Sequence, residues 1–258
     1  MINPFADPEY FVDHDLKCKD IELREEPKGA NPLPVSSSVP VASVVSSYRD
    51  LEFEVQASRN RSDKILYAFD ESLERLQSAG FERHPRPSEA FTLLADGIEG
   101  KLSGGLQKVS EDMLNNYGEW LSLAFERNND VLICYLDPKG LVWNTKSSEY
   151  VKDGFKFAEK KEFNIAGKPS QQWIELAEFS DNLVRFLYGR SFKDLPQDMR
   201  EGDKKAQLYL PSDGVVWPVA RDGFNDGYGV GGGNCNVGAS RGVRPAQKFF
   251  SGSVGGRK

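Results

Sequence analysis

The sequence predicts an α+β protein, in which an N-terminal helical subdomain is followed by a mixed C-terminal region that ends in an irregular loop. Two patterns carry this prediction. Apolar residues recur at helical spacing between residues 60 and 115, and short apolar runs rich in β-branched residues replace them from residue 131 onward. Because helices and strands fall into separate blocks, the order favours the α+β class over the regular alternation of a Rossmann or barrel fold.

Four parts are expected along the chain: an arm (1–47), a helical subdomain (48–128), a C-terminal domain (129–250) and a flexible tail (251–258). The arm is rich in proline and serine between residues 27 and 47, a composition typical of extended or disordered linkers. Its valines leave a second interpretation open, an extended segment that lies across the domain.

Within the helical subdomain, the strongest pattern is an amphipathic helix over residues 60–79, which Gly80 would end. Pro87 and Ser88 precede a second helix over 90–98, and a third is expected over 102–115. Residues 119–127 are assigned to the same subdomain.

The C-terminal region begins with a predicted hairpin, in which strands 131–136 and 141–144 flank the turn 137–140. A strand at 162–166 follows. Pro169 and Ser170 are expected to open a helix that ends near Gly189. The last predicted strands cover residues 207–210, 215–220 and 242–246.

Composition and charge exclude several classes of protein. The net charge of −6 argues against a general nucleic-acid binder, which needs clustered lysine and arginine. No apolar run approaches the roughly 18–20 residues that cross a bilayer, and the first residues are acidic, unlike a signal peptide. The three cysteines are widely spaced and predict neither a disulfide framework nor a zinc site. We therefore expect a cytoplasmic protein without nucleic-acid or membrane partners.

Each candidate catalytic or cofactor motif lacks the neighbouring residues or the secondary structure that it requires. The glycine run 227–233 is not followed by a Lys-Ser/Thr pair or a helix, so a phosphate-binding loop is not expected. Cys235 lacks a recognisable base, because the histidines are His14 in the arm and His84 in a proline-rich turn. Loop aspartates at 213, 222 and 226 match no EF-hand spacing. We expect no cofactor, no metal and no catalysis.

The segment 208–246 is the most distinctive part of the sequence. Twelve of the 24 glycines lie between residues 214 and 256, and residues 238–246 read GASRGVRPA. A Gly/Asn/Asp/Tyr loop followed by this phrase resembles the end of a C-type-lectin-like domain of the formylglycine-generating-enzyme type. More particularly, it resembles the variable proteins of diversity-generating retroelements, whose C-terminal codons are rewritten at adenines. Randomised AAC or AAT codons cannot encode Lys, Glu, Gln, Met or Trp, and none of these occurs in residues 222–240.

The resemblance implies a non-enzymatic protein that displays a diversified, hypervariable loop for ligand binding on a lectin-like scaffold, residues 129–250. Aromatic, Asn, Ser and Gly side chains suit such a surface, because they combine contact area with adaptable hydrogen bonding. The expected ligand is an unknown protein or other macromolecule. The displayed residues would be Phe224, Asn225, Asp226, Tyr228, Val230, Asn234, Cys235 and Asn236. Arg221, Arg241 and Arg244 would anchor the base of the loop.

Two alternatives remain open at this point. The first is an enzyme of unknown class with its site among the C-terminal Gly-rich loops, which would require convergent carboxylate, His or Cys groups in a pocket. The second is an adaptor protein whose helices between residues 60 and 116 carry the partner surface.

Overall fold

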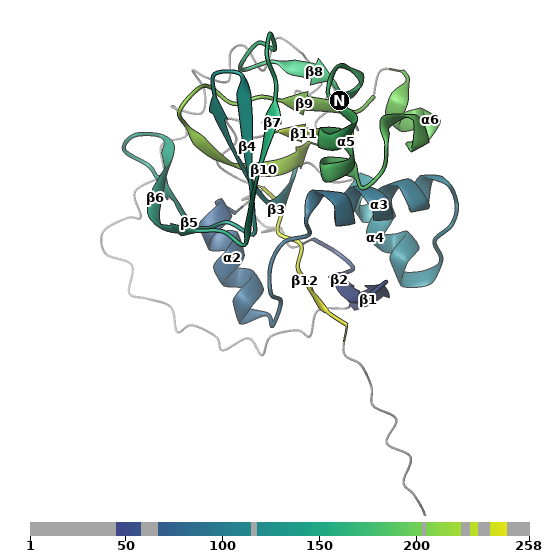
Figure 1. Ribbon diagram of the computed structural model, residues 1–258. Coiled ribbons are helices and arrows are strands. Elements are labelled where there is room, and N and C mark those ends of the chain that lie inside the picture. Colours follow the sequence, from purple (N-terminus) through teal and green to yellow (C-terminus); the bar gives the residue numbers. More distant parts are fainter. Residues whose placement is uncertain are drawn as a thin grey trace, which may run out of the picture.

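The computed structural model describes residues 45–57, 67–114, 118–202, 205–222, 228–231 and 238–246. The arm up to residue 44 and the tail 251–258 lie outside this range. The described residues form a mixed α+β fold with five α-helices and a curled seven-stranded sheet (Figure 1).

The large sheet has the strand order β7-β4-β3-β10-β11-β9-β8. Its strands are β3 (Glu119–Asn128), β4 (Val131–Leu136), β7 (Glu159–Asn164), β8 (Trp173–Glu175), β9 (Gln207–Tyr209), β10 (Val216–Asp222) and β11 (Gly229–Gly231). Neighbouring strands are antiparallel except β9 and β11, which are parallel. The C-terminal strands β10 and β11 therefore lie inside the sheet, between β3 and β9.

Both faces of the central strands are buried, and the alternation of side chains divides the core into two clusters. In β3, Leu121, Leu123 and Phe125 belong to the larger cluster, whereas Trp120 and Ala124 belong to the smaller one. Successive side chains of a strand point to opposite faces, so each face packs its own layer. This arrangement explains why β3 is buried along almost its whole length and why every residue of β4 is apolar.

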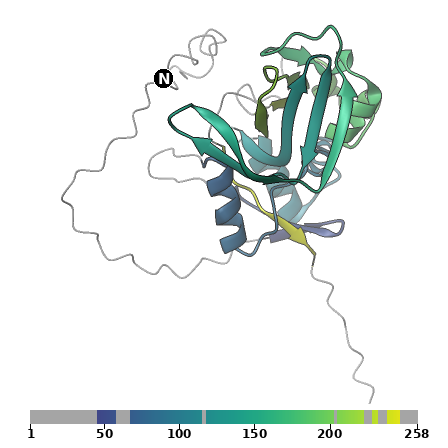
Figure 2. The same ribbon diagram turned by 60° about the vertical axis from the view of Figure 1, so that its left-hand side comes forward.

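Helices cover one face of the sheet. They are α3 (Pro87–Ile98), α4 (Gly104–Leu114), α5 (Asp181–Tyr188) and α6 (Gln197–Arg200), with two short 3₁₀ helices, η1 (Leu176–Glu178) and η2 (Phe192–Asp194). Helix α3 contributes Phe91 and Leu94 to the larger cluster, and α5 contributes Leu183 and Leu187. The opposite face carries α2 (Phe69–Ser78) and a hairpin of β5 (Lys139–Asn144) and β6 (Glu149–Lys156) (Figure 2).

A three-stranded sheet joins the two ends of the described chain. Its order is β1 (Val45–Tyr48), β2 (Leu51–Glu54) and β12 (Val243–Pro245). Val243 pairs with Phe53 in an antiparallel register, and both side chains are fully buried in the larger cluster. Residues 45–47, expected in the arm, are thus part of a sheet.

Several element predictions are corrected by the structure. Strands 131–136 and 141–144 form, but β4 pairs with β3 and β7, whereas β5 pairs with β6. Residues 119–127 form β3 instead of joining the helical subdomain. The helix expected from Ser170 begins only at Asp181, where Ser180 caps it, and ends at Gly189 in the left-handed region (φ 71°).

The expected boundary between residues 128 and 129 does not divide the structure. It falls in the tight connection between β3 and β4, which are neighbours in one sheet. Among the described helices, none is both long and apolar enough to cross a membrane.

Candidate binding site and its framework

The segments expected to bind ligand begin and end on buried residues of the sheet. Arg221 of β10 pairs with Val230 of β11 on one side and with Glu119 of β3 on the other. Glu119 in turn bridges Ala239. These four paired residues fix the point at which the chain leaves the sheet before residues 223–227 and the point at which it re-enters after them. They also fix the point at which the chain re-enters after residues 232–237. Residues 223–227 and 232–237 themselves lie outside the described part.

Residues 238–246, the closing segment, contact the core along most of their length. Gly238 exchanges backbone hydrogen bonds with Tyr67 and lies against the indole of Trp120, where an added Cβ would stand 3.0 Å from a ring carbon. At Gly242 an added Cβ would meet the ring of Phe81 at 2.2 Å. At Gly242 a side chain would require the Phe81 ring to move, and at Gly238 it would require a smaller shift of the Trp120 indole, so both positions of the GASRGVRPA phrase favour glycine.

Arg241 is the centre of a buried ion-pair network. Its side chain is fully buried and donates two hydrogen bonds to the Glu119 carboxylate, at 3.1 Å from Nε and 2.9 Å from Nη2. The guanidinium also pairs with Asp112 of α4 and donates to the backbone carbonyl of Val55 at 2.9 Å. Burial acts to lower the pKa of Arg241, but Glu119 and Asp112 outweigh burial and raise it further above its ordinary value.

Arg221 and Arg244 make contacts of a similar kind. Arg221 is almost fully buried and donates to the backbone carbonyl of Met113, at the end of α4. Arg244 pairs with Glu52 of β2 at 2.8 Å, and its guanidinium lies 5.5 Å from the centre of the Phe81 ring. The three arginines therefore tie β10 and the closing segment to α4 and β2.

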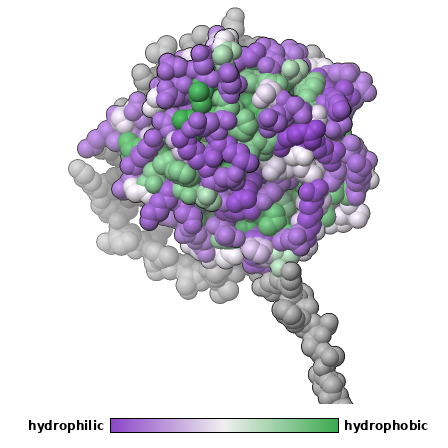
Figure 3. All heavy atoms as spheres, viewed as in Figure 1, coloured by the Kyte–Doolittle hydropathy of each residue, from purple (hydrophilic) through white to green (hydrophobic). Residues whose placement is uncertain are grey.

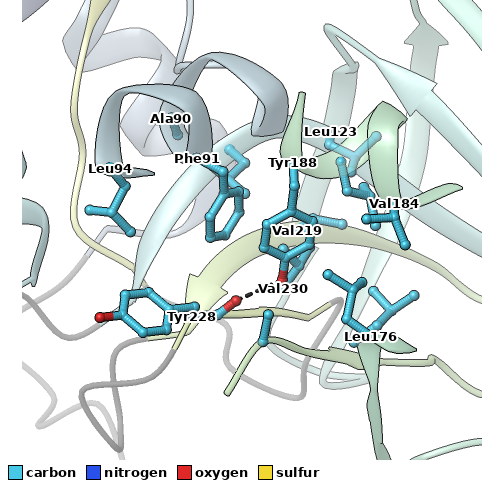
Figure 4. Packing of buried hydrophobic residues seen from close by; sticks show 14 of the residues in the cluster. Ala90, Phe91, Leu94, Leu123, Leu176, Val184, Tyr188, Val219, Tyr228 and Val230 are labelled. Atoms are coloured by element: carbon cyan, nitrogen blue, oxygen red, sulfur yellow. Dashed lines mark hydrogen bonds between the residues drawn. The ribbon is translucent and has the colours of Figure 1, made fainter. Parts of the chain in front are cut away.

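Two of the residues expected on the displayed surface belong to the core instead. Tyr228 is 6% exposed and Val230 is fully buried, and both pack in the larger hydrophobic cluster. The hydroxyl of Tyr188 donates to the backbone carbonyl of Tyr228 at 2.6 Å (Figure 4). Strand β11 lies between β10 and β9, and all three of its residues are buried. The other six residues, Phe224, Asn225, Asp226, Asn234, Cys235 and Asn236, lie outside the described residues.

The carboxylates of the network were not predicted from the sequence. Glu119 and Asp112 lie more than 100 residues before Arg241, the arginine with which they pair. No local pattern links partners at that separation, although buried arginine in general requires carboxylates.

Within the described residues, the histidine and the cysteine are both buried, whereas Asp213 is exposed and ion-paired. His84 is fully buried and hydrogen bonded to Ser72, with 2.6 Å between Nε2 and Oγ. Burial, followed by the charges of Arg75 and Arg83, lowers the pKa of His84 to about 3, so the ring is neutral. Cys134 is also fully buried, and burial raises the pKa of its thiol. Asp213 accepts a hydrogen bond from the Asn129 backbone and pairs with Arg127.

The described residues contain no group of three or more His, Cys, Asp or Glu side chains placed to hold a metal ion. Comparisons with family models, with curated proteins and with solved structures gave no match for this chain. The resemblance of its C-terminal segment therefore rests on the residues of that segment alone.

Proposed function

We propose that this protein binds a macromolecular ligand without catalysis, and that residues 223–227 and 232–237 supply the variable part of the binding surface. The observation that supports this proposal is the buried framework on which both segments begin and end. Arg221, Val230 and Ala239 bound the segments and are almost completely buried. Side chains between these fixed points can change without altering the core, which is what a diversified surface requires.

The proposal extends to the origin of the diversity, to the fold and to the compartment. We propose a variable protein of a diversity-generating retroelement, with a C-type-lectin-like C-terminal region, that acts in the cytoplasm. The closing segment supports the fold, because the GASRGVRPA phrase leads directly into the last strand, β12. The absence of Lys, Glu, Gln, Met and Trp from residues 222–240 supports the diversification.

Diversification can be tested in the DNA that flanks the gene. We expect a reverse transcriptase gene and a near-copy of the codons for residues 222–240 that differs from them at adenines. Flanking DNA that contains neither would contradict this part of the proposal.

Ligand binding can be tested with a display library. Codons 224–226 and 234–236 are randomised in the full chain, and the library is selected against lysozyme as a probe protein. We expect folded clones with a dissociation constant of about 1 μM or tighter. The matched library randomises the buried positions Val230, Ala239 and Ser240, and should contain few folded clones. Loss of folding in the first library, or a folded library without binders, would contradict the proposal.

A further inference from the structure

The β5–β6 hairpin and the residue after it carry hydrophobic side chains that are partly exposed to solvent. The large hydrophobic side chains that are exposed among the described residues are Val142, Val151 and Phe157, at 36%, 37% and 43%. Val142 and Val151 are cross-strand partners in the hairpin, and Phe157 directly follows β6. In Figure 2 the hairpin projects beyond the body of the protein above α2. Figure 3 shows an apolar area within a mostly hydrophilic surface on the side where Figure 1 places the hairpin.

Phe157 belongs to a group of aromatic rings at the end of β6. The ring of Phe157 lies 4.9 Å from that of Tyr135 and 5.7 Å from that of Phe155, measured between ring centres. Such groups of partly exposed aromatic and aliphatic side chains on a polar surface are typical of interaction sites.

The same region is positively charged in an acidic protein. Residues 139–161 carry six lysines against three carboxylates, whereas the whole chain has a net charge of −6. Lys152, Lys160 and Lys161 form ion pairs with neighbouring glutamates.

The remaining lysines of the region, Lys139, Lys146 and Lys156, form no ion pair with any described residue. Lys139 and Lys156 lie directly opposite each other in the hairpin. Like charges in this position destabilise a strand pair, and a carboxylate placed near them would relieve the repulsion.

We propose that residues 5–16 of the same chain bind this hairpin surface, defined as Lys139, Val142, Val151, Lys156 and Phe157. Residues 5–16 contain four carboxylates, at positions 7, 9, 13 and 15, and neither lysine nor arginine. They also contain Phe5, Tyr10 and Phe11, which can pack on the exposed side chains. The segment thus complements the surface in both charge and apolar character.

The length of the intervening chain permits this contact within one molecule. Residues 17–44 separate the segment from β1, and 28 residues span at most about 90 Å. A folded chain of this size has a radius of gyration of roughly 18 Å, so every point of its surface is within reach. Tethering also gives the segment an effective concentration on the order of millimolar, at which weak contacts suffice.

Zero-length carbodiimide cross-linking of the full chain tests the proposal, with cross-linked peptides identified by mass spectrometry. We expect links within one chain from carboxylates of residues 5–16 to Lys139, Lys146 or Lys156, and their loss in roughly 1 M salt, where the Debye length is about 3 Å. The control lysines are Lys108 of α4 and Lys193 of η2, which are also exposed. Links spread evenly over all five lysines, links only between chains, or no links from residues 5–16 would overturn the proposal.

A second experiment changes only residues 5–16 and leaves the residues of the hairpin surface as they are. The full chain with Asp7→Asn, Glu9→Gln, Asp13→Asn and Asp15→Asn is compared with the original chain for the rate at which each lysine is acetylated. Lys139 and Lys156 should react about threefold faster in the variant, as expected if the segment covers them two-thirds of the time. Lys108 and Lys193 should react at unchanged rates. Equal rates for Lys139 and Lys156 in the two proteins would overturn the proposal, and this result would not bear on the function of residues 223–237.

Discussion

His84 shows how a single side chain makes the stability of this protein depend on pH. The ring packs 5.2 Å from that of Phe69 and is fully buried beside two arginines, Arg75 and Arg83. Its Nδ1 atom has no hydrogen-bond partner among the described residues. A proton on this ring would place a third positive charge in a buried site, which explains why the pKa falls to about 3.

We predict that this histidine destabilises the folded protein as the pH falls below about 6.5, the pKa of an exposed imidazole. The unfolded chain takes up a proton at that pH, whereas the folded protein does not until about pH 3. The free energy of unfolding should therefore decrease by about 1.4 kcal/mol more in the original protein than in His84→Gln between about pH 7.5 and 5.5. Urea unfolding at both pH values measures this difference. Equal decreases in the free energy of unfolding for the two proteins would show that a group other than His84 causes the pH dependence.

The burial of single residues was the property that the sequence predicted least well. Tyr228 and Val230 stand in a Gly/Asn/Asp/Tyr stretch that predicts an exposed loop, but both side chains pack in the larger hydrophobic cluster with residues of α3 and α5. His84 was correctly placed between two helices, but its contacts with Ser72 and Phe69 of α2 were not predicted. Local sequence patterns do not encode tertiary contacts of these kinds.

At the scale of elements, the positions of most strands along the chain were predictable, but the strands with which they pair were not. The expected strands at 207–210, 215–220 and 242–246 correspond to β9, β10 and β12. Their neighbours in the sheets come from residues up to about 190 positions away, as for β12 and β2. Strand β3 was missed because both of its faces are buried, so its apolar residues do not alternate cleanly with polar ones.

Arg241 joins the closing segment to β2, β3 and α4, and we predict that its replacement is severely destabilising. Arg241→Met removes the ion pair and the two hydrogen bonds that Arg241 makes with the buried carboxylate of Glu119, at a cost of about 3–5 kcal/mol. Arg244→Met should cost no more than about 1 kcal/mol, because that ion pair with Glu52 is partly exposed to solvent. Urea unfolding of the two variants measures both losses of stability.

A second variant distinguishes the unpaired charge from lost packing. Adding Glu119→Gln to Arg241→Met removes the buried negative charge, so the double variant should be more stable than Arg241→Met alone. A further loss of stability would show instead that Glu119 contributes independently of Arg241.

At the scale of the whole molecule, the α+β class was predicted correctly and the division into subdomains was not. Helices do precede most strands along the chain, which is the order that the sequence showed. However, residues on both sides of the expected boundary share the larger hydrophobic cluster, for example Leu94 of α3 and Val219 of β10. The second strand of the described chain, β2, also pairs with its last strand, β12. The subdomain prediction failed because it used only the local order of elements.

We predict that residues 48–128 and the C-terminal region unfold as one cooperative unit. Leu94→Ala removes a fully buried side chain from α3 and should cost about 2–5 kcal/mol. In a single unit, the slowest backbone amides of β10 should then exchange with solvent faster by roughly 30-fold to several thousand-fold, and by the same factor as those of β3. Hydrogen exchange measured by NMR tests this directly, with Val142→Ala on the exposed hairpin as the control that should change little. Acceleration confined to residues 48–128 would mean that the two regions unfold separately, despite the strands and side chains that they share.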